Sequence, residues 1–119
     1  MRLLTSEQEG QLRANGAANA SRAARDQEPE DFEPVVKLFC PWGAATWLLT
    51  ELDPDDPDIA FGLCDLGMGF PELGSVSLSE LSSICGPGGL RIERDLYFTP
   101  SKTLQGYAVE ARRAGRIVT

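Results

Sequence analysis

The stretch PVVKLFCPWGAATWLLT, residues 34–50, decides the fold. Its two halves, residues 34–40 and 45–50, are rich in apolar and β-branched side chains and predict two strands. The Pro-Trp-Gly sequence between them predicts a tight turn. Lys37 is the only charged residue in the pair. We therefore expect a β-hairpin at this position.

Further strands are expected after the hairpin. Apolar runs at residues 59–65 and 74–78 predict a third and a fourth strand, and the alternation in LRIERDLYF (residues 90–98) predicts a fifth strand or an extended arm. An acidic, proline-containing loop (51–58) and a glycine-rich connection (66–74) separate these runs. Because consecutive strands have short links, we expect an antiparallel sheet of four to five strands in meander order.

Three helices are expected around this sheet. Thr5 with Gln8, or Ser6 with Glu9, forms a capping box that opens an N-terminal helix within residues 1–16, which Asn15-Gly16 is expected to end. A second capping box predicts a short helix near 78–85. The last helix runs from Ser101 or Thr103 to about Ala114 and ends at Gly115. The fold class is therefore α+β.

The chain is expected to form a single domain, residues 1–119. Residues 34–115 are expected to be its globular core. Residues 17–33 are predicted to be a flexible acidic linker, because they contain no large apolar side chain before Phe32. We expect this segment to be dispensable for the fold and to be cut first by proteases.

Charge is unevenly distributed along the chain. The formal net charge is −7, but residues 26–80 carry thirteen acidic residues against one basic residue, a net charge of −12. Such a block repels nucleic acid and attracts basic surfaces. We therefore expect a protein partner with a basic surface and no direct binding of nucleic acid. No apolar run is long enough to span a membrane, so no membrane partner is expected.

The residue types argue against common catalytic and metal chemistry. The chain has no histidine, which is the most frequent general base and metal ligand. Its three cysteines, Cys40, Cys64 and Cys85, form no CxxC pair and suit free thiols in a reducing cytoplasm. An EF-hand is excluded in the acidic loop, because its prolines and the position of its residues break the calcium-binding pattern. We expect no enzyme activity, no metal and no cofactor.

Two kinds of partner contact are plausible from the sequence. The acidic loop could steer a basic partner, in which case binding should weaken as salt rises. Trp42 at the hairpin turn could instead anchor a partner by apolar burial. The candidate partner-binding residues are Trp42, Asp53, Asp55, Asp56 and Asp58.

Two other classes of function remain open. A small enzyme or ligand-binding domain could use the glycine-rich segment Gly62–Gly74 with nearby carboxylates, and convergence of Asp65, Glu72 and Glu93 in a pocket would favour it. An oligomeric module could pair exposed strand edges between copies.

Several motifs of the chain resemble a bacterial family of proteins of unknown function, number 2958. They are, in order, Leu3-Leu4-Thr5, PVVKLF followed by PWG (34–43), Thr46-Trp47, Phe61-Gly62-Leu63, Glu72-Leu73-Gly74, SLSEL (77–81), GPGGL (86–90), IERDL (92–96) and Phe98. Tyr97 and Cys40 depart from the family pattern, where many members have His and Thr. A role for that histidine would therefore not carry over to this chain.

The resemblance implies a context rather than an activity. Family members are similar to proteins carried by conjugative plasmids, integrative elements and phages, often near antirestriction genes. The resemblance thus implies an accessory protein of a mobile element. A counter-defence factor that blocks a restriction enzyme or a CRISPR effector through an acidic surface would fit both this context and the charge block.

Overall fold

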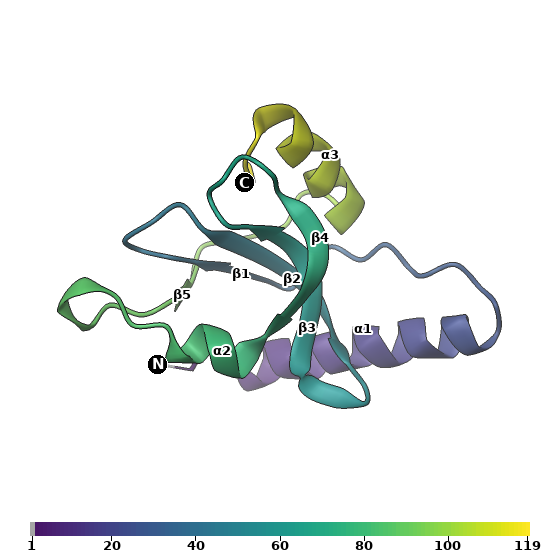
Figure 1. Cartoon of the computed structure of the whole chain (residues 1–119). Coiled ribbons are helices and arrows are strands. Elements are labelled where there is room, and N and C mark those ends of the chain that lie inside the picture. The colour runs from purple at the N-terminus through teal and green to yellow at the C-terminus, as the bar shows by residue number, and fades with distance from the viewer. Residues whose placement is uncertain (1) are drawn as a thin grey trace.

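The computed structural model describes residues 2–119, and within them five strands form one antiparallel sheet in the order β4-β3-β2-β1-β5 (Figure 1). The first four strands follow one another as the predicted meander, and β5 returns to pair with the free side of β1. The α+β class and the antiparallel sheet are confirmed. The strands are β1 Val36–Phe39, β2 Thr46–Asp53, β3 Asp56–Asp65, β4 Glu72–Ser77 and β5 Glu93–Arg94.

The helices are α1 Ser6–Ala24, α2 Leu78–Ser83 and α3 Leu104–Ala114, with one turn of 3-10 helix at Pro87–Gly89. The Thr5–Gln8 capping box that opens α1 has both of its predicted hydrogen bonds. Gly115 ends α3 in the left-handed conformation, as expected for a glycine at this position. In Figure 1, α1 runs along the lower side of the sheet and α3 lies at its upper end.

The two long helices belong to separate apolar clusters on opposite faces of the sheet. Neighbouring residues of a strand point to opposite faces. Trp47 and Leu49 of β2 pack in a cluster with Leu12 of α1, whereas Leu48 between them packs with Leu63 and the apolar side of α3. The strands are therefore covered on both faces. The α3 residues in the second cluster are Leu104, Tyr107, Ala108 and Ala111.

The predicted end of α1 at Asn15-Gly16 is wrong, because the helix continues to Ala24. These two residues instead attach α1 to β2. The Asn15 side-chain amide donates to the carbonyl of Thr50, 2.9 Å away, at an irregularity in the pairing of β2 with β3. A β-carbon at position 16 would lie 1.8 Å from the carbonyl oxygen of Leu52, so only glycine allows the helix to approach this closely.

Because α1 continues to Ala24, the predicted boundaries of the linker and of the globular core change. Part of the expected 17–33 linker is helical, and Leu4, Leu12 and Ile117 extend the core beyond residues 34–115. Residues 26–34 have no regular structure, and in Figure 1 they run back from the end of α1 to β1. Hydrogen bonds attach this segment to α1 and to the start of α3. Asn19 contacts the backbone of Glu30, and the carbonyl of Phe32 accepts from the backbone of Leu104.

Two further expectations need correction. The acidic stretch 51–58 is not a long loop, since β2 reaches Asp53, β3 begins at Asp56 and a two-residue turn joins them. The predicted strand over 90–98 shrinks to Glu93–Arg94. Of its alternating apolar residues only Ile92 is buried, whereas Leu90 and Leu96 are exposed. On its N-terminal side β5 loses its partner, because β1 ends at Phe39. On its C-terminal side the backbone of Asp95 still donates to the carbonyl of Lys37, and the chain then turns away, with the Asp95 side chain accepting from the backbone of Tyr97.

Candidate functional site

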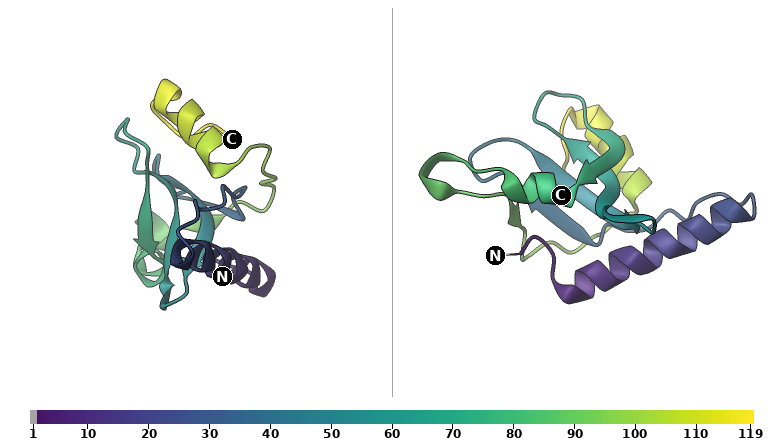
Figure 2. Two further views of the ribbon diagram at one scale, coloured as in Figure 1. Left: turned by 90° about the vertical axis from the view of Figure 1, so that its right-hand side faces the viewer. Right: turned by 60° about the horizontal axis from the view of Figure 1, so that its bottom comes forward.

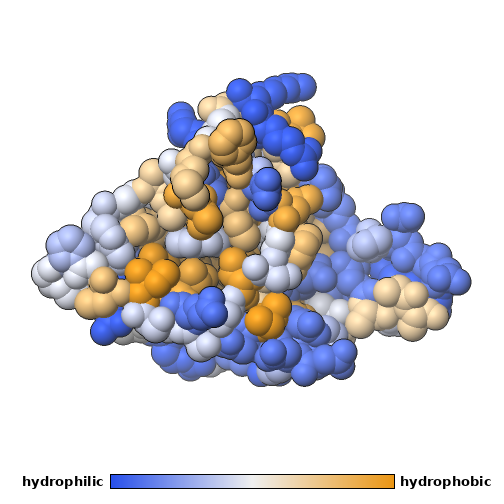
Figure 3. Space-filling model, viewed as in Figure 1, coloured by the Kyte–Doolittle hydropathy of each residue, from blue (hydrophilic) through white to orange (hydrophobic). Residues whose placement is uncertain are grey.

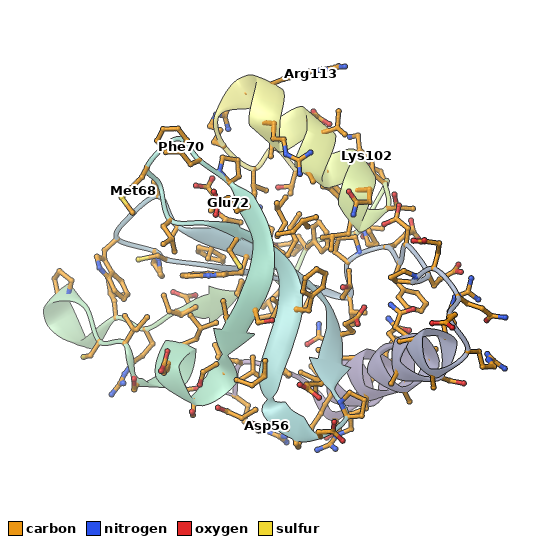
Figure 4. The ribbon with its side chains drawn as sticks, turned by 45° about the vertical axis from the view of Figure 1, so that its right-hand side comes forward. Asp56, Met68, Phe70, Glu72, Lys102 and Arg113 are labelled. Carbon is orange, nitrogen blue, oxygen red and sulfur yellow. The ribbon has the colours of Figure 1, made fainter. Side chains whose placement is uncertain are left out.

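The predicted acidic residues lie together at the turn between β2 and β3, and they differ in what they do. Asp53 and Asp56 accept hydrogen bonds from the backbone of Asp55 and Asp58 respectively, which shapes the turn. Asp55 is exposed at the tip. Figure 4 shows Asp56 at this end of the sheet, far from the loop that carries Met68 and Phe70.

Asp58 holds the start of α2. Its carboxylate accepts from the hydroxyls of Ser77 and Ser79, at 2.7 and 2.9 Å, and from the backbone of Ser79 at 2.9 Å. These hydrogen bonds, the Ser77 hydroxyl first, hold the pKa of Asp58 below its ordinary value. Asp58 is therefore occupied within the fold. Asp53 and Asp56 each use one carboxylate oxygen in the turn, and the side chain of Asp55 accepts no hydrogen bond within residues 2–119.

Trp42 lies at the other end of β2, in the turn that joins it to β1. Its side chain is half-buried and packs against the first apolar cluster. Gly86 lies directly on its ring, since a β-carbon there would come within 2.5 Å of it. The structure thus separates Trp42 from the acidic turn by the length of β2 and covers part of the ring that was expected to be free.

A groove of about 610 Å³ opens beside the acidic turn. It lies between the C-terminal half of α1, the 28–32 segment, the β2–β3 hairpin and the first turn of α3, and Ser75 of β4 also lines it. Its lining combines apolar side chains with five carboxylates. The apolar residues include Phe32, Ile59, Phe61 and Leu104, and the acidic ones are Glu28, Glu30, Asp31, Glu51 and Asp53.

Little positive charge faces these five carboxylates. Within residues 2–119 their only ion pair joins Arg22 to Glu30, and it is long, at 3.9 Å. Asp31 accepts instead from the backbone of Gln105 at the start of α3, at 3.1 Å. The groove therefore presents an uncompensated negative potential above an apolar floor, which suits a ligand that is both cationic and apolar.

Glu51 is the least exposed carboxylate of the groove. Its side chain accepts from the amide of Asn19, 2.8 Å away, so α1 sets its position. Burial raises the pKa of Glu51, and the hydrogen bond from Asn19 partly opposes this shift. The same Asn19 side chain bonds to both backbone groups of Glu30 and thereby joins the two walls of the groove.

The sequence patterns predict little of the groove. Residues 28–31 and Glu51 belong to the acidic block, but the patterns predict a linker at 17–33 and a loop at 51–58. No pattern points to Asn19. The available signal is the combination of Asn15 and Gly16 in the middle of a helical stretch whose only large apolar residue is Leu12, since glycine permits close approach of another backbone.

The carboxylates of the alternative enzyme hypothesis do not converge. Asp65 is buried and accepts from the backbone of Gly67 at 2.8 Å and of Ile117 at 2.9 Å, which attaches the C-terminal segment to the sheet. Glu72 lies on β4 and Glu93 on β5, the two opposite edges of the sheet. Glu80 is exposed on α2.

The glycine-rich segment of the same hypothesis, Gly62–Gly74, is a hairpin that joins β3 to β4, and Gly62 pairs with Gly74 in it.

The cysteines are free thiols, and burial raises the pKa of Cys64. Among the described residues no group of three or more Cys, Asp or Glu side chains is arranged to hold a metal ion. None of the helices in residues 2–119 is both long and apolar enough to cross a bilayer.

Comparison with known proteins gives a family but no activity. The model of a family described as protein of unknown function (DUF2958) matches residues 3–118. No curated protein and no solved structure matches the chain.

Proposed function

The chain belongs to the DUF2958 family, and from this premise we propose that it is a non-enzymatic protein that binds a basic segment of another protein in its acidic groove. The observation that carries this proposal is the groove itself. Five carboxylates with a single long ion pair surround an apolar floor. A peptide segment with arginine or lysine next to a large apolar side chain satisfies both features at once.

The partner class follows from the mobile-element context that the family resemblance implies. We propose a counter-defence role, in which the groove and the neighbouring acidic turn occupy a basic, nucleic-acid-binding surface of a restriction enzyme or CRISPR effector. Arginine and lysine in such channels pair with phosphates spaced along the nucleic acid. The carboxylates of residues 28–31 and of the β2–β3 turn offer closely spaced negative charges in their place.

The groove is tested first with a defined probe. A fluorescent arginine-rich peptide that also contains leucine is titrated with the protein at increasing salt, and anisotropy is measured. The double substitution Glu28→Gln/Glu30→Gln should weaken binding about tenfold, and salt should weaken the wild type steeply. The control Glu7→Gln/Glu80→Gln changes the net charge equally at exposed positions outside the groove and should bind like the wild type.

An equal loss of peptide binding in both double variants would mean that only the total charge matters. That result would rule out the groove as the binding site. The counter-defence role is tested separately by phage plating on hosts that carry a restriction system or a CRISPR effector. Expression of the wild type should raise plating efficiency, and the groove variant should lose this effect while the control keeps it. Failure of the wild type against every system would overturn the counter-defence role and leave the peptide result to decide the binding site.

A further inference from the structure

The edge strand β4 has little of the protection that an exposed edge normally has. It is paired with β3 over six consecutive residues without a register shift, and its other side pairs with no strand in residues 2–119. Exposed edges are usually blocked by lysine, proline or a β-bulge. The sequence ELGSVS of β4 has no lysine and no proline, and its single charge stands at its first residue. In Figures 1 and 2, β4 forms the open border of the sheet.

Neither backbone conformation nor packing within residues 2–119 requires a glycine at position 74, in the middle of β4. A β-carbon added there would meet nothing within 4 Å, and its backbone is not left-handed. By contrast, a β-carbon at its partner Gly62 would meet the carbonyl of Leu48 at 1.9 Å. Glycine within a strand weakens it and often marks a place where another backbone approaches. Gly74 lies on the free edge of the sheet with room for such an approach.

Exposed apolar side chains lie at both ends of the same strand. The β3–β4 loop presents Leu66, Met68 and Phe70, which are 59, 70 and 79% exposed. Figure 4 shows Met68 and Phe70 projecting from this loop, away from the sheet. Ile84, which follows α2 at the other end of β4, is also exposed. Apolar residues gather around the loop and the area below it in the surface view of Figure 3.

We propose that β4 pairs with β4 of a second copy of this chain to form a two-fold symmetric dimer. An antiparallel pair places the start of one strand beside the end of the other. The Met68–Phe70 loop of each copy therefore approaches the α2 end of its partner, and both apolar patches are covered by one symmetric contact. Side chains that face each other across such a pair point to the same face of the sheet. Pairing centred on Gly74 therefore sets Glu72 opposite Val76, and no like charges face each other.

The dimer contact uses the free edge of β4, of which only Ser75 also lines the acidic groove, and the two contacts depend on different forces. Each copy carries a net charge of −7, so two copies repel each other at long range. Screening by salt should therefore strengthen the dimer. Salt should weaken the binding of a basic peptide in the groove. The two proposals thus predict opposite responses to the same variable and can fail independently.

The test is the mass of the full chain in solution. Sedimentation equilibrium over a concentration series, at low and at high salt, should show the mass rising from 12.9 kDa toward twice that value, with the rise at lower concentration in high salt. Gly74→Glu sets two like charges opposite each other and should abolish the dimer. Met68→Ser/Phe70→Ser, at side chains already exposed, should abolish it as well.

The matched control is Gly10→Glu. It makes the same change of residue and charge at an exposed glycine of α1 with open space around it, and it should dimerise like the wild type. Circular dichroism of all variants verifies that each is folded. A wild type that stays at 12.9 kDa throughout both salt series would overturn the proposal. So would a folded Gly74→Glu variant whose mass rises as that of the wild type does.

Discussion

The two long helices are attached to the sheet in different ways. α3 packs by a row of apolar side chains, and its N-cap, apolar face and terminal glycine all follow the usual rules for an amphipathic helix. α1 buries only one large apolar side chain, Leu12, and attaches by the close approach of Gly16 and by the Asn15 amide. The comparison teaches that a mostly polar helix can dock by backbone proximity, without an apolar stripe.

The groove lies where these two modes of attachment meet. Gly16 and Asn19 of α1 form one wall, and Leu104 and Gln105 at the start of α3 form another. Its shape therefore depends on the distance between α1 and β2, while its floor depends on the packing of α3. Substitutions that disturb one helix and spare the other separate these contributions.

The largest effect is expected from Gly16→Ala. The new methyl group would lie 1.8 Å from the Leu52 carbonyl oxygen, so the helix or strand must shift, at a cost of about 3 kcal/mol in the free energy of unfolding. Gly10→Ala is the control in the same helix, where the methyl group has open space and should stabilise by about 0.5–1 kcal/mol. Urea unfolding measures both. Equal effects of the two substitutions would contradict the close helix–strand contact.

A smaller loss is expected on the α3 side from Asp65→Ala. The buried carboxylate accepts from two backbone N–H groups, and its removal leaves the N–H of Ile117 without a partner at a buried position, at a cost of about 2 kcal/mol. Glu33→Ala, at an exposed position outside β4, should change stability by less than about 0.5 kcal/mol. Thermal unfolding of both variants decides whether Asp65 is a structural anchor.

The next effect concerns acid stability and Asp58. Its pKa is lower in the folded chain than its ordinary value of 3.8, so the stability it contributes is present above pH 3.8 and is lost as pH falls through the folded value. Asp58→Ala should lower Tm at neutral pH and flatten the decline of Tm in acid. Asp55→Ala, at the exposed tip, should leave the profile unchanged. An unaltered acid decline in Asp58→Ala would refute this role.

The smallest effect is expected from Glu51→Gln in the groove, which should stabilise the fold slightly, whereas the preceding test substitutions destabilise it. Burial raises the pKa of Glu51, so ionisation as pH rises through the folded value removes stability. Gln keeps the acceptor for Asn19 and removes the charge, so Tm should rise slightly at neutral pH and match the wild type in acid. A lower Tm at neutral pH would mean that the charge of Glu51 stabilises the fold.

Local patterns in the sequence determined most of the elements of this protein. The apolar runs of the hairpin, the capping box at Thr5 and the apolar face of α3 each contain their signal within a few residues, because strand burial and helix capping depend on near neighbours. The acidic charge of residues 26–80 and the absence of histidine could likewise be seen directly.

Only the tertiary structure decided where α1 ends, where the fifth strand ends and what the acids surround. Asn15 and Gly16 stop an isolated helix, but the Thr50 carbonyl and the Leu52 backbone, more than thirty residues away, give them partners that keep α1 intact. The strand expected at 90–98 is short because β1 ends at Phe39 on one side and the chain turns away after Asp95 on the other, and the local alternation indicates neither limit. The groove unites residues of α1, β2, β3 and α3 that are far apart in the chain. Long-range contacts of this kind arise from the shape of neighbouring elements, so no short window of sequence encodes them.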